Sequence, residues 1–216
     1  MTPYYEHAGV AIYHGDCRDV LPALPRADLV LTDPPYGIGE ARGKNASRGN
    51  LAVAIDYGVE SWDDEPVDAE LIGAVIAAGR YAVVFGGNYY DLPPSSCWLV
   101  WDKENGGNDF ADAELAWTNY GTAVRLIRHM WNGMLRKGGE HRSHPTQKPL
   151  GVMAWALTAC PIVAELVLDP FMGSGTTLRA AKDLGRRAIG IEIEERYCEI
   201  AARRLSQGVL DFGAVP

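Results

Sequence analysis

The sequence predicts an α/β fold, in which one mainly parallel sheet carries helices on both faces. Short apolar runs that stop at polar or glycine-rich turns are typical of strands buried in such a sheet, and residues 29–31 and 81–85 are two of them. Between these runs, apolar side chains recur every three or four positions over residues 66–79, which indicates an amphipathic helix. Residues 165–193 follow the order strand, glycine turn, helix, strand, which is the repeating unit of a parallel sheet.

The composition predicts a single globular domain that spans residues 1–216. Of these residues 47% are hydrophobic and 22% are charged, which is ordinary for a soluble protein. No apolar run approaches the length of a membrane span, and residues 1–6 do not resemble a signal peptide. We therefore expect a cytoplasmic protein that has no membrane partner.

Charge and cysteine usage narrow the function classes. The net charge of −8 argues against a protein that coats nucleic acid with its whole surface, but it allows a local basic patch. The four cysteines lie far apart, and no pair has the spacing of metal ligands or of a redox pair. They are Cys17, Cys97, Cys160 and Cys198. We therefore predict reduced thiols and no metal site.

The first part of the chain alternates strands and helices around one long irregular segment. A strand over residues 10–13 is followed by a short helix that ends near Leu24, before Pro25. After the strand at residues 29–31, residues 37–62 show no period and contain many small or polar side chains. A loop of this length inside a compact domain is usually functional or disordered. We predict a mobile loop that clamps the substrate.

The rest of the chain predicts five further strands, which brings the sheet to seven. The strands cover residues 81–85, 97–101, 113–117, 165–169 and 188–193, and the helices cover residues 149–157, 176–184 and 194–206. Asp68 and Glu70 in the first turn of the helix over residues 66–79 interact favourably with the helix dipole. Gly185 is suited to end the helix that precedes it.

The stretch from Asp33 through Pro34 and Pro35 to Tyr36 directly follows a buried strand. Proline cannot donate a ladder hydrogen bond, so the strand stops there. One carboxylate, two free carbonyl groups and one aromatic ring then lie at the carboxyl end of a strand, where open α/β sheets bind ligands. This turn can present acceptors to a flat ligand that bears an amine, with Tyr36 stacked on its face. The alternative is an ordinary strand-to-loop turn, because Asp and Pro are common turn residues.

Residues 119–143 form a basic segment in an otherwise acidic chain. Between residues 120 and 148 there are six basic residues and one acidic residue, Glu140. The basic residues are Arg125, Arg128, Arg136, Lys137, Arg142 and Lys148. Aromatic and amide side chains, such as Trp131 and Asn132, are interleaved with them. The segment predicts a surface that faces a polyanion, and the alternative is a solvated edge in which charges cluster by chance.

The glycine turn after the strand over residues 165–169 indicates a nucleotide-like ligand. Gly173 and Gly175 let a ligand contact the backbone, and Glu192, about 20 positions later, can accept hydrogen bonds from both ribose hydroxyls. Neither the third glycine of a dinucleotide site nor the lysine of a P-loop follows. Asp169, just ahead of the turn, would repel a pyrophosphate but suits a cationic amine or sulfonium. This favours S-adenosylmethionine over NAD or ATP.

Three motifs together carry a family resemblance. The stretch DPPY at residues 33–36 and the stretch DPFMGSGTT at residues 169–177 resemble the motifs of the amino-directed DNA methyltransferases. The stretch HPTQKP at residues 144–149 is similar to the segment that precedes the cofactor turn in their β class. The catalytic motif precedes the cofactor motif, which is the permuted order of that class. The resemblance implies a circularly permuted, Rossmann-like methyltransferase fold that uses S-adenosylmethionine and acts on double-stranded DNA.

The resemblance also implies roles for individual residues. The catalytic residues would be Asp33, Pro34, Pro35 and Tyr36. The cofactor would be bound by Asp16, Cys17, Asp33, Lys148, Asp169, Phe171, Gly173, Ser174, Gly175, Thr176, Thr177 and Glu192, and Thr146 and Pro149 would help Lys148 to close its methionine end. DNA binding would fall to Arg125, Arg128, Arg136, Lys137 and Arg142. For Asp16 and Cys17 alone, a helix cap and a buried thiol are the plain alternatives.

Adenine is the expected target, because Asp at the first position of the catalytic motif is the tendency of adenine-specific members, whereas cytosine-specific relatives more often carry Ser. The alternatives are a cytosine-N(4) DNA methyltransferase and an RNA methyltransferase acting on adenine or guanine. A glutamine-modifying protein methyltransferase disagrees with the motif order, and a degenerate DNA-binding relative disagrees with the intact motifs. A homodimer and a cognate restriction endonuclease are further partners that the resemblance suggests.

Overall fold

The computed structural model of the chain describes residues 1–37, 67–105, 111–131 and 147–206. The predicted substrate loop over residues 37–62 therefore lies outside the described residues, apart from Gly37. The strands are β1 (Tyr5–His7), β2 (Val10–His14), β3 (Ala27–Thr32), β4 (Gly79–Phe85), β5 (Trp98–Asp102), β6 (Ala113–Thr118), β7 (Arg125–Arg128), β8 (Leu166–Asp169) and β9 (Arg187–Glu192). The helices are α1 (Cys17–Val20), α2 (Ala69–Ala77), α3 (Leu150–Thr158), α4 (Thr176–Asp183) and α5 (Glu195–Ser206), with short 3₁₀ turns η1 (Leu21–Ala23) and η3 (Gly87–Tyr89).

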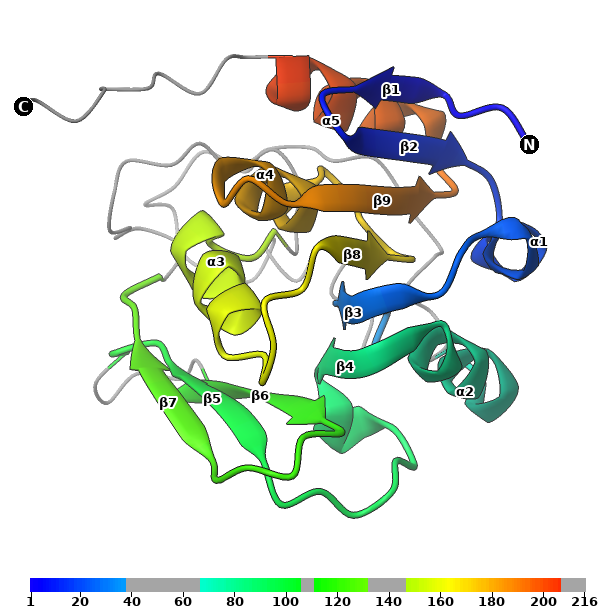
Figure 1. The fold of residues 1–216 in the computed structure, drawn as a ribbon. Coiled ribbons are helices and arrows are strands. Elements are labelled where there is room, and N and C mark those ends of the chain that lie inside the picture. The colour runs from blue at the N-terminus through cyan, green and yellow to red at the C-terminus, as the bar shows by residue number, and fades with distance from the viewer. Residues whose placement is uncertain (38–66, 106–110, 132–146, 207–216) are drawn as a thin grey trace, which may run out of the picture.

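All strands of the described chain belong to one nine-stranded sheet (Figure 1). Its order is β1-β2-β9-β8-β3-β4-β6-β5-β7. The strands from β2 to β4 in this order are parallel to one another, whereas β6 is antiparallel to both of its neighbours. The predicted fold class, a mixed α/β sheet with helices on both faces, is confirmed.

The predicted count of seven strands is wrong, because the sheet has an additional strand at each edge. β1 pairs antiparallel with β2 across a tight turn, in which Ala8 and Gly9 both have positive φ. β7 pairs in parallel with β5 and lies inside the predicted basic segment. One strand has three residues and the other begins and ends with exposed arginines. Neither therefore shows the hydrophobic period by which a strand is recognised.

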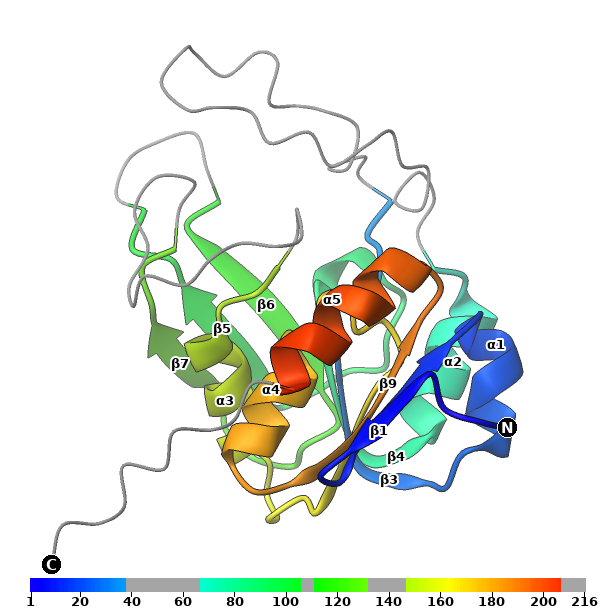
Figure 2. The same ribbon diagram turned by 90° about the horizontal axis from the view of Figure 1, so that it is seen from above.

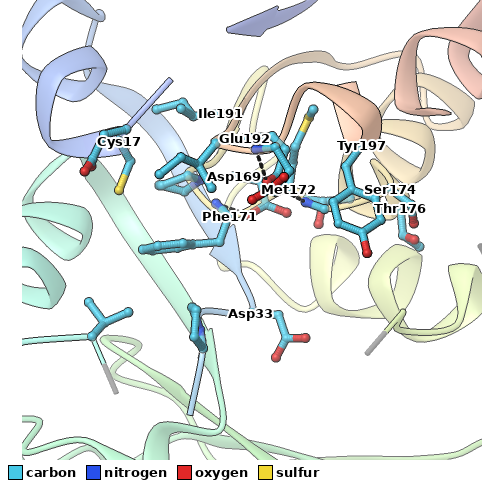
Figure 3. A pocket seen from close by; sticks show the side chains of 18 of the residues that line it. Cys17, Asp33, Asp169, Phe171, Met172, Ser174, Thr176, Ile191, Glu192 and Tyr197 are labelled. Carbon is cyan, nitrogen blue, oxygen red and sulfur yellow. Dashed lines mark hydrogen bonds between the residues drawn. The ribbon is translucent and has the colours of Figure 1, made fainter. Parts of the chain in front are cut away.

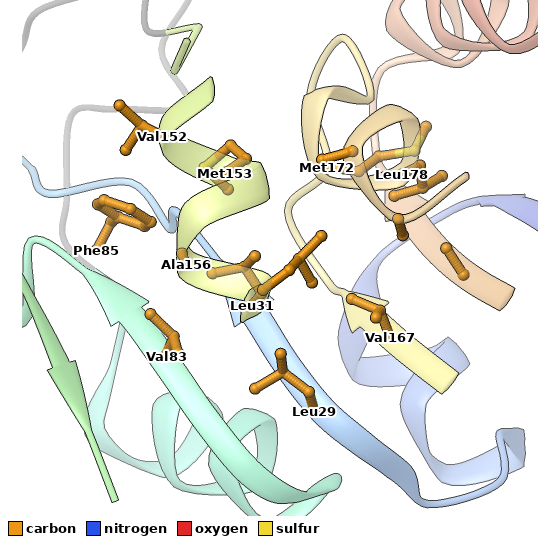
Figure 4. Packing of buried hydrophobic residues seen from close by; sticks show 14 of the residues in the cluster. Leu29, Leu31, Val83, Phe85, Val152, Met153, Ala156, Val167, Met172 and Leu178 are labelled. Atoms are coloured by element: carbon orange, nitrogen blue, oxygen red, sulfur yellow. The ribbon is translucent and has the colours of Figure 1, made fainter. Parts of the chain in front are cut away.

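Two hydrophobic clusters hold the helices on the two faces of the sheet (Figures 1 and 2). Side chains alternate along β3, so Leu29 and Leu31 point to the face that α3, α4 and α5 cover, where they join Met153 (Figure 4). Val30 points the other way and packs in the cluster that includes Val75 of α2. Each of these β3 side chains is fully buried. Burial of one such side chain stabilises the folded state by about 1.5–3 kcal/mol.

The permuted chain order brings two distant turns to one edge of the sheet. β8 follows β3 by more than a hundred residues but lies beside it in the sheet, with Leu29 paired to Val167 and Val30 to Leu168. Because parallel strands end at the same edge, the turn after β3 and the glycine turn after β8 lie close together. None of the helices in the described ranges has the length and apolar character needed to cross a membrane.

Candidate active site

A cavity of about 430 Å³ lies at the carboxyl ends of the central parallel strands (Figure 3). Its wall includes Asp33 and Pro35 of the turn after β3, and Gly173 of the glycine turn after β8. The two predicted halves of the site therefore meet in one cavity. Most other predicted cofactor residues also line it, namely Asp16, Cys17, Lys148, Asp169, Phe171, Ser174, Thr176, Thr177 and Glu192.

The glycine turn is shaped by backbone hydrogen bonds and positive φ angles. Met172 donates its amide to the Ile191 carbonyl at 3.1 Å, and Gly175 donates to the Met172 carbonyl at 2.9 Å. Gly175 has φ +78°, and a side chain there would approach Ala201 of α5 to 2.9 Å. Gly175 thus supports the turn from behind, while Gly173 and Ser174 form the cavity wall.

Asp169 ends β8 and is buried at the base of the cavity. Its Oδ1 accepts hydrogen bonds from the Thr32 hydroxyl at 2.8 Å and from the Phe171 amide at 3.1 Å. Burial raises the pKa of Asp169 to about 6, against the opposing effect of these donors and of Thr177. A cation bound beside this carboxylate would favour its ionised form.

Glu192 ends β9 and lies next to the glycine turn. Its two carboxylate oxygens accept hydrogen bonds from the Gly173 amide at 2.9 Å and from the Glu194 amide at 2.8 Å. Burial raises the pKa of Glu192 to about 7. The predicted acid at the tip of this strand is therefore in place on the cavity wall, and its role towards ribose hydroxyls stays a prediction.

Asp16 lines the cavity from its other side and also caps α1. Its side chain accepts a hydrogen bond from the Arg18 amide at 2.8 Å, which is the plain alternative considered for this residue. Arg18 in turn reaches Asp68, the cap of α2, at 2.9 Å. Cys17 is buried beside them. Contact of Asp16 or Cys17 with a cofactor stays a prediction.

Among the described residues, the side chains of Lys148 and Tyr36 bind the carboxylate of Asp33. Lys148 Nζ lies 2.6 Å from Asp33 Oδ2, and the Tyr36 hydroxyl donates to Asp33 Oδ1. Burial raises the pKa of Asp33, and the Lys148 ammonium group opposes this effect. Lys148 thus contacts the predicted catalytic acid and also lines the cavity, and its role at the methionine end of the cofactor stays a prediction.

The other residues of the turn after β3 are held in place by residues that directly follow β4. The Tyr90 hydroxyl lies 3.1 Å from the Pro34 carbonyl oxygen and 2.6 Å from that of Pro35. The Tyr36 ring stacks on Tyr89, with ring centroids 4.9 Å apart and an interplanar angle of 15°. Gly86 makes this arrangement possible, because a side chain at Gly86 would collide with the Tyr36 ring at 2.1 Å.

Comparison with protein families identifies the family of the chain. A family model described as DNA methylase matches residues 93–203, which is more than half of the chain. The chain belongs to this DNA methylase family. Within the described residues of the methylase, no group of three or more His, Cys, Asp or Glu side chains is placed to hold a metal ion.

Curated relatives of the methylase resemble it over nearly its whole length. The Type II methyltransferase M.ScaI of Streptomyces caespitosus is 28% identical over 267 residues, which span 94% of this chain and 83% of that protein. The Type II methyltransferase M.HinfI of Haemophilus influenzae is 28% identical over 246 residues, which span 91% of this chain and 68% of that protein.

Solved structures share the fold of the methylase. The crystal structure of the M1.HpyAVI–SAM complex superposes with a TM-score of 0.59 and 24% identity, covering 90% of this chain and 99% of that chain. The PvuII DNA methyltransferase, described as cytosine-N4-specific, superposes with a TM-score of 0.59 and 16% identity, covering 96% of this chain and 90% of that chain. The predicted Rossmann-like methyltransferase fold is thus confirmed.

The methylase also contains charged residues at this site that the sequence analysis did not single out. Glu114 of β6 lies 3.2 Å from Lys148 Nζ and 2.6 Å from Lys103 Nζ, measured from its two carboxylate oxygens. Although burial acts to raise the pKa of Glu114, Lys148 and Lys103 outweigh it and hold the pKa below its ordinary value. The one feature of the sequence that could have indicated Glu114 is its position as an acidic residue inside the apolar run over residues 113–117.

The predicted DNA-binding residues of the methylase are described only in part. Arg125 and Arg128 lie on the edge strand β7, where both are exposed, and Arg128 Nε is 3.3 Å from Asp102. Three of the predicted residues lie outside the described residues, namely Arg136, Lys137 and Arg142. Thr146, assigned to the cofactor, also lies outside them.

Proposed function

We propose that this DNA methylase is a site-specific enzyme that transfers a methyl group from S-adenosylmethionine to the exocyclic amine of an adenine in double-stranded DNA. One observation carries the proposal: the acceptor-rich turn that begins at Asp33 and the glycine turn at Gly173 open into the same cavity. A methyl donor seated in the glycine turn would then lie beside a base held at the other turn.

The residues of the cavity fit S-adenosylmethionine, the methyl donor of this family. The volume of about 430 Å³ lies in the range of small-molecule sites. The Asp169 carboxylate is buried and accepts hydrogen bonds from a hydroxyl and an amide, so a cationic amine would complete its surroundings. Glu192 would accept from the ribose hydroxyls, and Gly173 would allow contact with the backbone. When bound, the sulfonium group supplies the electrophilic methyl group.

The residues at Asp33 and Pro34 address the main chemical difficulty of the reaction. An exocyclic amine is a weak nucleophile, because its lone pair is delocalised into the base. The Asp33 carboxylate and the Pro34 carbonyl would accept its two hydrogens and favour a tetrahedral nitrogen, which stabilises the transition state more than the ground state. Each carboxylate oxygen has two lone pairs, so Asp33 can accept this bond while Lys148 and Tyr36 also donate to it.

The target base would have to leave the double helix to reach this cavity. Tyr36 would hold the extruded base by stacking, and its ring already stacks on a flat aromatic partner, Tyr89. Tyr90 fixes the carbonyl groups of Pro34 and Pro35, so the acceptors would not need to reorganise when the base arrives. Positioning of the amine in line with the methyl group would supply much of the remaining rate enhancement.

Asp at the first position of the catalytic turn supports adenine over cytosine as the target base. Residues 119–143 would read the DNA sequence, with Arg125 and Arg128 on phosphates together with the other basic residues of the segment. A short segment of this kind suits a short target or the help of a second subunit. A homodimer and a cognate restriction endonuclease are the partners that such an assembly would have.

Nucleoside analysis tests the proposed function directly. The purified chain is incubated with unmethylated genomic DNA and isotopically labelled S-adenosylmethionine, and the digested nucleosides are separated by mass spectrometry. We expect label in N6-methyladenine, at one sequence context when the modified DNA is sequenced. Label in N4-methylcytosine would contradict the base assignment. Label only in an RNA substrate tested in parallel would contradict the proposal as a whole.

A further inference from the structure

Four charged side chains of alternating sign connect the candidate catalytic acid to the far strands of the sheet. Lys148 Nζ lies 2.6 Å from Asp33 and 3.2 Å from Glu114, and Glu114 lies 2.6 Å from Lys103 Nζ. Lys148 is the most buried, with 7% of its side chain exposed, and the other three are between 17% and 23% exposed. The four residues come from four separate segments of the chain.

We infer that Glu114 is a positioning residue for methyl transfer, which together with Lys103 anchors Lys148 beside Asp33 and so sets the charge on the carboxylate that receives the base. This inference rests on the proposed function, because it treats Asp33 as the acceptor of the target amine. Neither Glu114 nor Lys103 lies on the wall of the cavity that Asp33 lines. Both would therefore act through Lys148 and without contact to the substrate.

The position of the Lys148 ammonium group is fixed from several directions. Two carboxylates flank it, the Tyr36 hydroxyl lies 3.3 Å away, and it lies 5.5 Å from the ring centroids of both Tyr36 and Phe85. A lysine has a flexible stem and loses conformational entropy when it is held in place. Lys103 Nζ holds the other carboxylate oxygen of Glu114 at 2.6 Å, so Glu114 can keep Lys148 in place when a base takes one lone pair of Asp33.

The charges that face Asp33 give the inference a signed test. The charged groups are Lys148 from the segment before α3, Glu114 from β6 and Asp169 from the end of β8, and the neutral hydroxyl of Tyr36 from the same turn donates to Asp33. Loss of the Lys148 charge leaves Asp33 buried without its cation, which favours the protonated acid. Loss of the Glu114 charge removes a repelling anion, which favours the carboxylate. Loss of the Lys103 charge should shift the titration midpoint of Asp33 in the same direction as loss of the Lys148 charge. The shift should be smaller, because Lys103 contacts Glu114 and not Asp33.

The variants Lys148→Met, Glu114→Gln and Lys103→Met separate these effects. Gln keeps the size of Glu114 and an oxygen that can accept from Lys148. Each variant is labelled with ¹³C at the aspartate carboxyl groups, and the Asp33 signal, assigned with Asp33→Asn, is titrated by NMR. The acid limb of kcat/KM for DNA is measured in parallel. Glu165→Gln, an exposed glutamate elsewhere, is the matched control.

We expect the Asp33 midpoint and the acid limb to rise by about 1–3 pH units in Lys148→Met. They should rise by a smaller step in Lys103→Met and fall in Glu114→Gln, and they should not move in the control. A purely structural role would lower activity without these opposite shifts. Gln removes the charge of Glu114 and keeps the contact to Lys148, so a Glu114→Gln midpoint equal to the parent, or above it, would show that the charge of Glu114 does not act on Asp33. Glu114→Ala removes the contact as well, and a midpoint no higher than that of Glu114→Gln would overturn the anchoring of Lys148 by Glu114. If Lys148→Met does not fold, the opposite signs of the other two variants still decide.

The two readouts separate failure of the inference from failure of the proposed function. NMR titration reports on Asp33 without any methyl transfer, so it tests the charge network even in a chain that modifies no DNA. Absence of methylation by the folded parent would sink the proposed function alone. Normal methylation with unshifted midpoints in all three variants would sink the inference alone.

Discussion

The two ends of the cavity hold their carboxylates by different means. At the end with the glycine turn, Asp169 and Glu192 accept hydrogen bonds from hydroxyl and backbone amide groups. At the other end, Asp33 is paired with the ammonium group of Lys148 and bonded to the hydroxyl of Tyr36. Burial raises the pKa of all three acids, but only for Asp33 does a lysine of the site oppose it.

This difference separates two kinds of ligand. Neutral donors fix the position of a carboxylate without cancelling its charge. A bound cationic ligand can therefore still stabilise the ionised carboxylates at the end with Asp169 and Glu192. An internal ion pair cancels the charge of Asp33 while leaving lone pairs open, which suits an uncharged amine that needs an acceptor. This difference supports the proposed placing of the cationic methyl donor at the end with the glycine turn and of the neutral base at the end with Asp33.

The variant Asp33→Ala should break the catalytic end and leave the other intact. Loss of the acceptor for the amine should lower methyl transfer by about a thousandfold or more, while the dissociation constant for S-adenosylmethionine should change by less than about tenfold. Turnover assays and titration calorimetry measure the two effects, with the exposed Asp91→Ala as a control. Lost cofactor binding in Asp33→Ala would refute this division of roles.

The variant Asp169→Asn should have the complementary effect. Asn keeps the size of the side chain but removes its charge, so a cationic ligand loses one charge-assisted contact, which corresponds to an affinity about 10- to 100-fold weaker. DNA binding, measured by fluorescence anisotropy, should stay within about twofold of the parent. Asp19→Asn on the exposed side of α1 provides the control. Parental affinity for S-adenosylmethionine in Asp169→Asn would place the cationic group elsewhere.

Stability without cofactor should depend on pH through the end with the glycine turn. The pKa values of about 6 for Asp169 and about 7 for Glu192 lie above the usual 3.8 and 4.5. Between these limits the folded chain binds more protons than the unfolded chain, so this contribution to the free energy of unfolding is present at low pH and is lost as pH rises through 6 and 7.

Urea unfolding at about pH 5 and pH 8 measures this loss, which we expect to be about 1–1.5 kcal/mol larger in the parent than in Asp169→Asn. Saturating S-adenosylmethionine should reduce the difference, because a cation favours the ionised acids. An equal pH dependence in the parent and the variant would show that Asp169 titrates as an ordinary carboxyl group.

The sequence predicted those parts of this comparison that depend on contiguous residues. The turn from Asp33 to Tyr36 and the glycine turn at Gly173 each consist of a strand end and the residues that follow it, so local patterns reveal them. That both turns end in one cavity followed from parallel strands ending at the same edge. The fold class was predicted for the same reason, since the central strands and the helices carry strong hydrophobic periods.

The partners of those residues could not be predicted, because they depend on register between distant segments. Glu114 reaches Lys148 only because β6 pairs with β5 such that Glu114 lies opposite Trp101. A shift of one residue would turn it to the other face of the sheet. Tyr90 meets Pro34 and Pro35 from a segment more than fifty residues away, and no spacing rule links them.

The variant Tyr90→Phe should give the smallest of these effects and shows how far the catalytic end depends on its supports. It removes the hydroxyl that contacts the Pro34 and Pro35 carbonyls and keeps the ring. One neutral hydrogen bond contributes about 0.5–1.5 kcal/mol, so we expect kcat to fall about 3- to 10-fold. Affinity for S-adenosylmethionine should not change, because both carbonyl groups that the hydroxyl contacts belong to the catalytic turn.

Tyr89→Phe is the matched control, because it keeps the ring that stacks on Tyr36 and should leave kcat near the parental value. If both variants matched the parent, the carbonyl groups would hold their positions without Tyr90, and the rigidity of the two prolines alone would orient the Pro34 acceptor. If Tyr90→Phe instead weakened cofactor binding, the two ends of the cavity would be coupled through the turn after β3, and their separation into independent halves would be wrong.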